Sequence, residues 1–221
     1  MSTPAPLEER AALALQLRRA GVRDVGIMRA LELAPREDFA PYRFRDLANR
    51  DIALPIGCGQ TMPSAADLGR RLEILGVQAG DRVLEIGSGS GYSAAVLARI
   101  AREVVSLERY RSLATEAAAR LERLGVGNAH VVCADGLAPN AAAGSFDRII
   151  LHVALSEAPR GLYERLAEGG AIVFGRRQSR AGRTVTRLVR VERKAPDSAF
   201  VESDRGSCRL PPVGAERARA L

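Results

Sequence analysis

Residues 82–100, RVLEIGSGSGYSAAVLARI, decide the fold of this chain. The apolar segment from Val83 to Ile86 lies between two glycine positions and predicts a short buried strand. The glycine-rich segment 87–91 predicts a tight turn, because glycine lets the backbone bend sharply and approach a ligand closely. Residues 92–100 are mostly small or aliphatic and predict a helix whose first amides face that ligand. Strand, glycine turn and helix form the opening unit of a nucleotide-binding α/β domain.

Two later strands are predicted to bring carboxylates to the same edge as the glycine turn. The apolar segment 104–107 ends at Glu108, about twenty residues after the turn, where an acidic side chain accepts hydrogen bonds from ribose hydroxyls. Segment 130–134 ends at Asp135, whose carboxylate is placed to receive an adenine amino group. The glycines follow G-x-G-x-G rather than the G-x-G-x-x-G of dinucleotide sites. This spacing favours a site for S-adenosylmethionine over a site for a dinucleotide, because S-adenosylmethionine has no pyrophosphate that needs the extra glycine spacing.

Strand and helix patterns alternate between residues 81 and 175 and predict a parallel sheet with helices on both sides. The predicted elements cover residues 82–86, 92–101, 104–108, 111–124, 130–134, 146–152, 158–167 and 171–174. After residue 175 the alternating segments 184–191, 199–201 and 208–210 have no helix between them, which predicts an antiparallel hairpin at the sheet edge.

The chain is expected to form a single domain over residues 1–221 with three parts. Helices over 7–20 and 24–33 and a loop occupy residues 1–64, the α/β core occupies 65–175, and the C-terminal strands occupy 176–221. Ser64 is predicted to cap a helix whose apolar positions are Leu68, Leu72 and Leu75. The loop before it, LPIGCGQTMPS over residues 54–64, is rich in small and turn-forming residues, so we expect it to fold over a bound ligand.

Composition limits the class of protein. Apolar residues make up 47% and charged residues 27%, which is typical of a globular protein, and no apolar run reaches the ~18 residues of a membrane span. The N-terminus has no basic head before its apolar residues, so no signal peptide is predicted. Cys58, Cys133 and Cys208 are odd in number and far apart, which predicts reduced thiols in a cytoplasm and no zinc site. Cys133 is expected to be a small core residue.

The net charge of +7 arises in residues 176–221, which hold 12 of the 33 Lys and Arg residues and 5 of the 26 Asp and Glu residues. A basic region of this kind can attract nucleic acid or acidic peptides. Phe200 is its only aromatic residue, so the stacking platforms of nucleic-acid sites are missing. We therefore favour a solvated, arginine-rich surface without a nucleic-acid partner.

Six segments resemble, in order, the protein-L-isoaspartate O-methyltransferase family. They are LPIGCGQT (54–61), VLEIGSGSGYSAAVLA (83–98), SLER (106–109), ADGL (134–137), FDRIIL (146–151) and LAEGGAIVF (166–174). Residues 17–41 also resemble the family's opening helices, and CRLPPV (208–213) resembles its closing strand. The glycine turn is shared by many methyltransferases, whereas the GQT loop and the opening helices are more specific.

The resemblance implies an α/β fold with a doubly wound, mostly parallel seven-stranded sheet, N-terminal helices and an antiparallel C-terminal hairpin. It implies an enzyme that binds S-adenosylmethionine and methylates the free α-carboxylate of an L-isoaspartyl residue in a damaged protein or peptide, leaving S-adenosyl-L-homocysteine. The methyl ester then cyclises to a succinimide, which reopens partly to normal aspartate. The cofactor-binding residues that it implies are Glu85, Gly87, Ser88, Gly89, Gly91, Glu108, Arg109, Asp135 and Gly136.

The sequence departs from the family's pattern near the expected acceptor. Pro63, which has neither a hydroxyl nor an amide hydrogen, stands where the family has a substrate-side serine. Thr61 and Ser64 are the remaining hydroxyls of this loop and are the candidates for holding the carboxylate. His152 replaces part of a small Thr-Ala-Ala run and puts an imidazole near the cleft, and the proline usual after the fifth strand is missing near Gly175.

Three functions remain open at this point. A carboxylate acceptor is ionised at neutral pH, so methylating it requires alignment but neither a general base nor a metal. A second possibility is the same fold acting on a hydroxyl or amine of a small molecule, peptide or RNA, with His152 as the base. The third is a non-catalytic module that only binds the cofactor. For His152 itself, a strand-end histidine without a chemical role is the alternative to catalysis.

Overall fold

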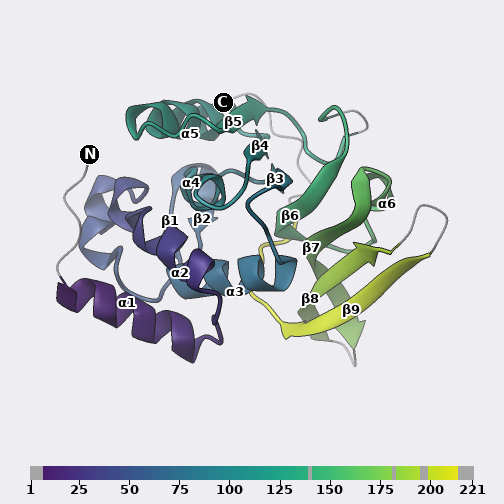
Figure 1. Cartoon of the computed structure of the whole chain (residues 1–221), viewed down its shortest axis with the longest axis horizontal. Coiled ribbons are helices and arrows are strands. Elements are labelled where there is room, and N and C mark those ends of the chain that lie inside the picture. Colours follow the sequence, from purple (N-terminus) through teal and green to yellow (C-terminus); the bar gives the residue numbers. More distant parts are fainter. Residues whose placement is uncertain (1–6, 139–140, 181–182, 195–198, 214–221) are drawn as a thin grey trace.

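The computed structural model describes residues 7–138, 141–180, 183–194 and 199–213. Its centre is a seven-stranded sheet in the order β5-β4-β3-β6-β7-β8-β9 (Figure 1). The strands of this sheet are β3 (Arg82–Ile86), β4 (Glu103–Glu108), β5 (Ala129–Cys133), β6 (Phe146–Leu155), β7 (Leu166–Arg180), β8 (Arg183–Arg193) and β9 (Phe200–Ser207). The helices are α1 (Leu7–Arg19), α2 (Val25–Glu32), α3 (Ala65–Leu75), α4 (Tyr92–Ala98), α5 (Arg111–Arg123) and α6 (Arg160–Tyr163).

The sheet is parallel from β5 to β7 and antiparallel from β7 to β9, as expected for a doubly wound core closed by a C-terminal hairpin. The strand order reverses between β3 and β6, which pair directly. In open α/β sheets, ligands bind in the crevice beyond the carboxyl ends of the strands at such a reversal. Figure 1 shows α1 and α2 at one end of the molecule and the β8–β9 hairpin at the other.

Alternating strand residues bury both faces of the sheet. Val83, Val104 and Val173 pack on one face with α1 to α4, and Leu84, Ile149 and Phe174 pack on the other face, which α6 covers. This alternation follows from the pleat of a strand, in which successive side chains point to opposite faces. The described helices include none that is long and apolar enough to cross a lipid bilayer.

The predicted turns and caps have the conformations that their residues favour. Gly87, Gly89 and Gly91 all have positive φ, at 95°, 54° and 85°, which explains why this turn requires glycine. The Ser64 hydroxyl accepts a hydrogen bond from the Asp67 amide at 3.2 Å and caps α3, as predicted.

A small hairpin precedes the core. Strands β1 (Leu54–Pro55) and β2 (Thr61–Met62) pair antiparallel around the 3₁₀ helix η3 (Gly57–Gly59). The buried Arg36 fixes this hairpin and the segment before it. Its guanidinium donates hydrogen bonds to the carbonyls of Pro63 at 2.9 Å, Ala48 at 2.8 Å and Ile52 at 2.7 Å. Arg36 lies in η1 (Arg36–Asp38), and η2 (Tyr42–Leu47) follows it.

Three expectations from the sequence are wrong. The helix predicted over 158–167 is only the short α6, because Leu166 already pairs with Phe146 in the sheet. The strand predicted over 208–210 is absent from the described elements, since β9 ends at Ser207 and Leu210 packs into the core instead. Cys133 is exposed rather than buried, because β5 is an edge strand.

Candidate active site

A cavity of about 260 Å³ lies at the carboxyl ends of β3, β4 and β5, where the cofactor residues were predicted. Six of the nine predicted residues line it: Gly87, Gly89, Glu108, Arg109, Asp135 and Gly136. Gly59 and Gln60 of the β1–β2 hairpin also line it, so this loop borders the cavity, and its folding over a bound ligand stays a prediction.

Glu108 organises the glycine turn from the end of β4. One of its carboxylate oxygens accepts a hydrogen bond from the Gly89 amide, and the other accepts one from the Tyr110 amide, both at 2.9 Å. The side chain is buried, with 5% of its surface exposed, yet it borders the cavity. A carboxylate has about four acceptor positions, so Glu108 can accept further hydrogen bonds from two neighbouring hydroxyls of a ribose.

Asp135 and Gly136, which follow β5, also line this cavity. Asp135 is exposed, and one oxygen accepts a hydrogen bond from the Leu137 amide at 3.1 Å. A Cβ atom at Gly136 would lie 2.7 Å from a methyl carbon of Ile86, so only glycine keeps the two segments this close. A carboxylate beside a glycine-lined slot suits a planar, amine-bearing ring such as adenine, and together with Glu108 the set of donors and acceptors fits an adenosyl cofactor.

The other three predicted residues lie behind the cavity wall. Glu85 is fully buried and Ser88 is 4% exposed, while Gly91 begins α4 and packs against Ala117. Ser88 contacts the Ser106 hydroxyl, which in turn donates a hydrogen bond to Glu85. These residues therefore hold the glycine turn in shape from inside the protein.

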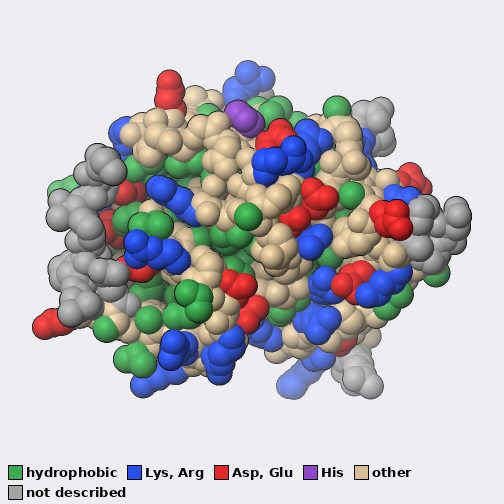
Figure 2. Space-filling view, in the orientation of Figure 1, with side chains coloured by type: hydrophobic (Ala, Val, Ile, Leu, Met, Phe, Trp, Pro, Cys, Tyr) green, Lys and Arg blue, Asp and Glu red, His purple; other side chains and the backbone are tan. Residues whose placement is uncertain are grey.

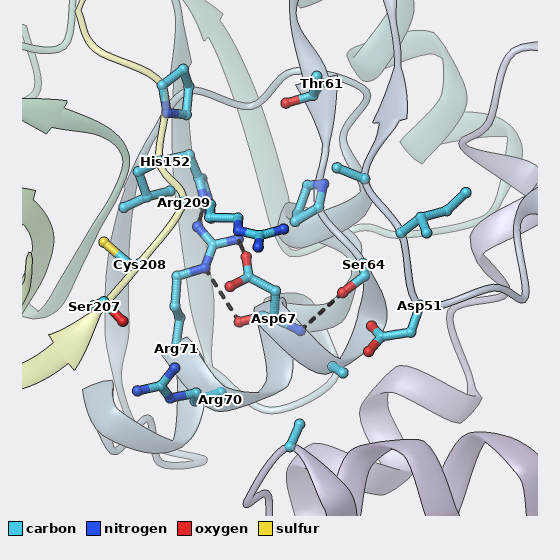
Figure 3. A pocket seen from close by; sticks show the side chains of 17 residues that line it. Asp51, Thr61, Ser64, Asp67, Arg70, Arg71, His152, Ser207, Cys208 and Arg209 are labelled. Atoms are coloured by element: carbon cyan, nitrogen blue, oxygen red, sulfur yellow. Dashed lines mark hydrogen bonds and ion pairs between the residues drawn. The ribbon is translucent and has the colours of Figure 1, made fainter. Parts of the chain in front are cut away.

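A second, larger cavity of about 690 Å³ adjoins the first (Figure 3). All three predicted catalytic residues, Thr61, Ser64 and His152, line it. Thr61 and His152 also line the first cavity, together with Pro211 from the segment after β9. The two cavities thus meet at Thr61, His152 and Pro211.

The two candidate hydroxyls have different surroundings. Ser64 is buried and its oxygen caps α3 through the Asp67 amide (Figure 3). Thr61 is exposed on β2, at the junction of the cavities. Thr61 is therefore the hydroxyl best placed to meet a ligand that spans both cavities.

Cys208 also lines the larger cavity. Burial raises the pKa of its thiol, which stays protonated at neutral pH.

Both ring nitrogens of His152 contact protein groups. Nδ1 lies 2.7 Å from the Arg71 guanidinium, and Nε2 lies 2.9 Å from the Glu85 carboxylate and 3.0 Å from the Ser93 hydroxyl. His152 is thus near the cleft, as predicted, but it belongs to a buried polar cluster.

Three parts of the cavity lining were not predicted from the sequence: Arg71, Tyr110 and the segment 211–213. Arg71 had a signal, because it lies between Leu68 and Leu72 on the apolar face of the predicted helix. The segment 208–213 resembles the family's closing strand, and of its residues only Pro212 forms an isolated parallel bridge, with Ala154. Throughout the described part of the chain, no three His, Cys, Asp or Glu side chains gather as a metal site.

Comparison with known proteins decides the family. The model of the protein-L-isoaspartate (D-aspartate) O-methyltransferase family matches residues 8–217. The chain belongs to this family. Membership confirms the expected class of enzyme and its expected methyl donor, S-adenosylmethionine.

Individual relatives agree with this assignment. Protein-L-isoaspartate O-methyltransferase 2 of Rhodopseudomonas palustris is 41% identical over 221 residues, which is 100% of both chains. A protein-L-isoaspartate O-methyltransferase of Xanthobacter autotrophicus is 46% identical over 166 residues, covering 75% of this chain and 76% of the relative.

Solved structures confirm the fold. A protein-L-isoaspartate O-methyltransferase structure superposes with a TM-score of 0.80 at 30% identity, covering 94% of this chain and 67% of the other. The structure of a Plasmodium falciparum protein described as an isoaspartate methyltransferase, in complex with S-adenosyl-L-homocysteine, gives a TM-score of 0.76 at 19% identity. That match covers 94% of this chain and 99% of the other.

Proposed function

We propose that this enzyme methylates the free carboxylate of L-isoaspartyl residues in damaged proteins by holding cofactor and acceptor in the two adjoining cavities. The observation that carries this proposal is the junction at Thr61 and His152, because both residues line both cavities. A methyl group bound in the smaller cavity would meet an acceptor oxygen from the larger one at this junction.

The chain's own residues have three tasks in this reaction. Glu108 and Asp135 hold the adenosyl part of the cofactor, and the glycine turn accommodates its methionine part. When bound, the cofactor supplies a methyl group on a positively charged sulfur. Thr61 donates a hydrogen bond to the acceptor carboxylate and orients one oxygen toward the methyl group. Alignment of two bound reactants can lower a barrier by about 7–11 kcal/mol at best.

The carboxylate acceptor is favoured over a hydroxyl or amine because none of the described residues at the junction is a free base. An alcohol or ammonium group must lose a proton during methyl transfer, whereas a carboxylate has already lost it at neutral pH. His152 is the one histidine lining these cavities among the described residues, and both of its nitrogens have protein partners.

The partner of the enzyme is an isoaspartyl-containing protein or peptide, and we expect it to meet the enzyme in the cytoplasm. The described cysteines Cys58, Cys133 and Cys208 are all free thiols, which suits a reducing compartment. We do not expect nucleic acid to be a partner of this enzyme. The basic C-terminal strands carry acidic partners, such as Asp204, 2.8 Å from Arg187, and Figure 2 shows acidic and basic side chains mixed over the visible face.

Radioactive methyl transfer to a pair of synthetic peptides tests the proposal. The two peptides have the same sequence and differ only in an isoaspartyl or a normal aspartyl residue. We expect base-labile methyl ester on the isoaspartyl peptide alone, since only in this isomer does the peptide bond run through the β-carboxyl and leave the α-carboxylate free. The proposal fails if the enzyme binds S-adenosylmethionine but methylates neither peptide, and then hydroxyl and amine acceptors become the alternatives to test.

A further inference from the structure

A chain of buried polar side chains connects the larger cavity with the glycine turn. It begins at Arg71 of α3, which is 2% exposed and pairs with the Asp67 carboxylate at 2.9 Å (Figure 3). The Arg71 guanidinium also reaches the His152 ring at 2.7 Å, and His152 reaches Glu85 at 2.9 Å. From Glu85 the chain continues through Ser106 on β4 to Ser88 in the turn.

The direction of each hydrogen bond follows from which groups can only donate or only accept. A guanidinium has no acceptor, so His152 Nδ1 accepts the hydrogen bond from Arg71. An ionised carboxylate has no donor, so His152 Nε2 carries the proton and donates it to Glu85. The imidazole is therefore neutral and has no free lone pair, which leaves it unable to act as a base.

The same chain of polar side chains compensates the buried charge of Glu85. Glu85 is fully buried, and an isolated carboxylate in that position would be strongly destabilising. It accepts hydrogen bonds from Ser106 and His152, but both of these donors are neutral. Arg71 is the cation at the end of the chain, and it polarises the His152 ring toward Glu85.

The location of this chain of polar side chains relates it to the methyl-transfer reaction. The position that a Cβ atom would occupy on Gly87 lies 3.4 Å from the Cβ of His152, so the histidine packs directly against the turn. Its ring also forms part of the wall shared by both cavities. A displacement of this ring would therefore change the cofactor turn and the junction together.

We infer that Arg71 is a positioning residue for methyl transfer, which acts through a neutral His152 and the buried Glu85 to hold the glycine turn and the junction of the two cavities in place. Replacing Arg71 with methionine removes the cation and leaves the lone pair on His152 Nδ1 without a donor. The imidazole can then take up a proton and become the missing cation beside Glu85. Activity and stability of Arg71→Met should therefore depend on the protonation of His152, unlike those of the wild type.

The sign of this dependence is fixed by the groups around the ring. His152 faces Glu85 on β3 and Ser93 on α4, and Asp67 of α3 and Arg209 after β9 line the same cavity. Glu85 favours the imidazolium in the folded variant, so the compensation is present at low pH and is lost as the pH rises. The variant is therefore compared with the wild type at a mildly acidic pH and a mildly alkaline pH, pH 6 and pH 8.5.

The test measures Arg71→Met against the wild type at pH 6 and pH 8.5. At pH 8.5 we expect kcat/KM of Arg71→Met to be about tenfold below that of the wild type. At pH 6 the ratio of variant to wild-type kcat/KM should be at least about fivefold higher than at pH 8.5. Affinity for S-adenosyl-L-homocysteine by calorimetry and the unfolding temperature of the ligand-free variant should recover in the same direction. These two readouts need no acceptor, so they separate this inference from the isoaspartyl activity on which the kinetic readout rests.

Two further variants make the result decisive. Arg70→Met removes the same charge one residue away in the same cavity, where the guanidinium contacts the Arg205 carbonyl and not His152, and should introduce no pH dependence. His152→Gln replaces the ring with an amide that can accept from Arg71 and donate to Glu85. It should keep at least about a third of the cofactor affinity, whereas His152→Leu should lose about tenfold or more. A loss of kcat/KM in Arg71→Met that is the same at both pH values would overturn the inference. If Arg71→Met does not fold, equal cofactor affinities of His152→Gln and His152→Leu would overturn it.

Discussion

The carboxylate of Glu108 accepts a hydrogen bond from the backbone amide of Gly89 at 2.9 Å. This contact joins the end of β4 to the middle of the glycine turn, so the acidic residue shapes the turn as well as bordering the cavity. Glu108 thus has two effects on the cofactor. Its free lone pairs can bind ribose hydroxyls, and its bonds to the turn orient the segment that receives the methionine part.

Replacing Glu108 with alanine should weaken binding of S-adenosylmethionine by ~1–3 kcal/mol, the range for losing hydrogen bonds to a charged group. Calorimetric titration with the cofactor measures the change. Glu122→Ala is the matched control, because that side chain is exposed on α5 and lines neither cavity. Equal affinities for wild type and Glu108→Ala would remove Glu108 from the cofactor site.

A methyl group at position 136 should close the cofactor cavity. The new Cβ atom in Gly136→Ala would lie 2.7 Å and 2.9 Å from two carbons of Ile86, so β3 or the Asp135 segment must shift. We expect S-adenosyl-L-homocysteine to bind about tenfold more weakly, since either shift moves cavity-lining residues. Gly127→Ala is the control, because a Cβ atom there meets nothing within 4 Å. If both variants bind like the wild type, the contact between Gly136 and Ile86 is not part of the cofactor site.

The site residues that could be predicted from the sequence are those whose role follows from the pattern of neighbouring residues along the chain. The glycine turn and Glu108 follow from strand ends and spacing, because parallel strands deliver their carboxyl ends to one edge. Arg36 was not predictable, since its partners at Ala48, Ile52 and Pro63 are backbone carbonyls brought together only by the fold. Arg71 gave a partial signal as a charge on an apolar helix face, but its partner His152 lies 81 residues away.

Thr61 and Ser64 should separate into a functional and a structural hydroxyl. Ser64→Ala removes the cap of α3 and should lower the free energy of unfolding by about 1 kcal/mol, measured by urea denaturation, with kcat/KM nearly unchanged. Thr61→Val keeps the shape of an exposed strand residue, so stability should hold while kcat/KM for an isoaspartyl peptide falls about tenfold. The reverse outcome, with activity lost in Ser64→Ala and kept in Thr61→Val, would assign the carboxylate to Ser64.

Pro63 provides the sharpest test of the acceptor site, because it lies between these two hydroxyls and lines the larger cavity. Its carbonyl accepts a hydrogen bond from Arg36 at 2.9 Å, and a serine at this position keeps that carbonyl. Pro63→Ser should therefore fold normally and place a third hydroxyl near the junction. We expect kcat/KM for an isoaspartyl peptide to be maintained or raised, and cofactor affinity to stay the same because Pro63 is absent from the lining of the smaller cavity. In the Thr61→Val background, the added serine should restore part of the lost activity, since either hydroxyl can donate to the same carboxylate. A tenfold loss in Pro63→Ser with unchanged unfolding temperature and cofactor affinity would instead mean that a hydroxyl here obstructs the true acceptor, which then differs from an isoaspartyl carboxylate.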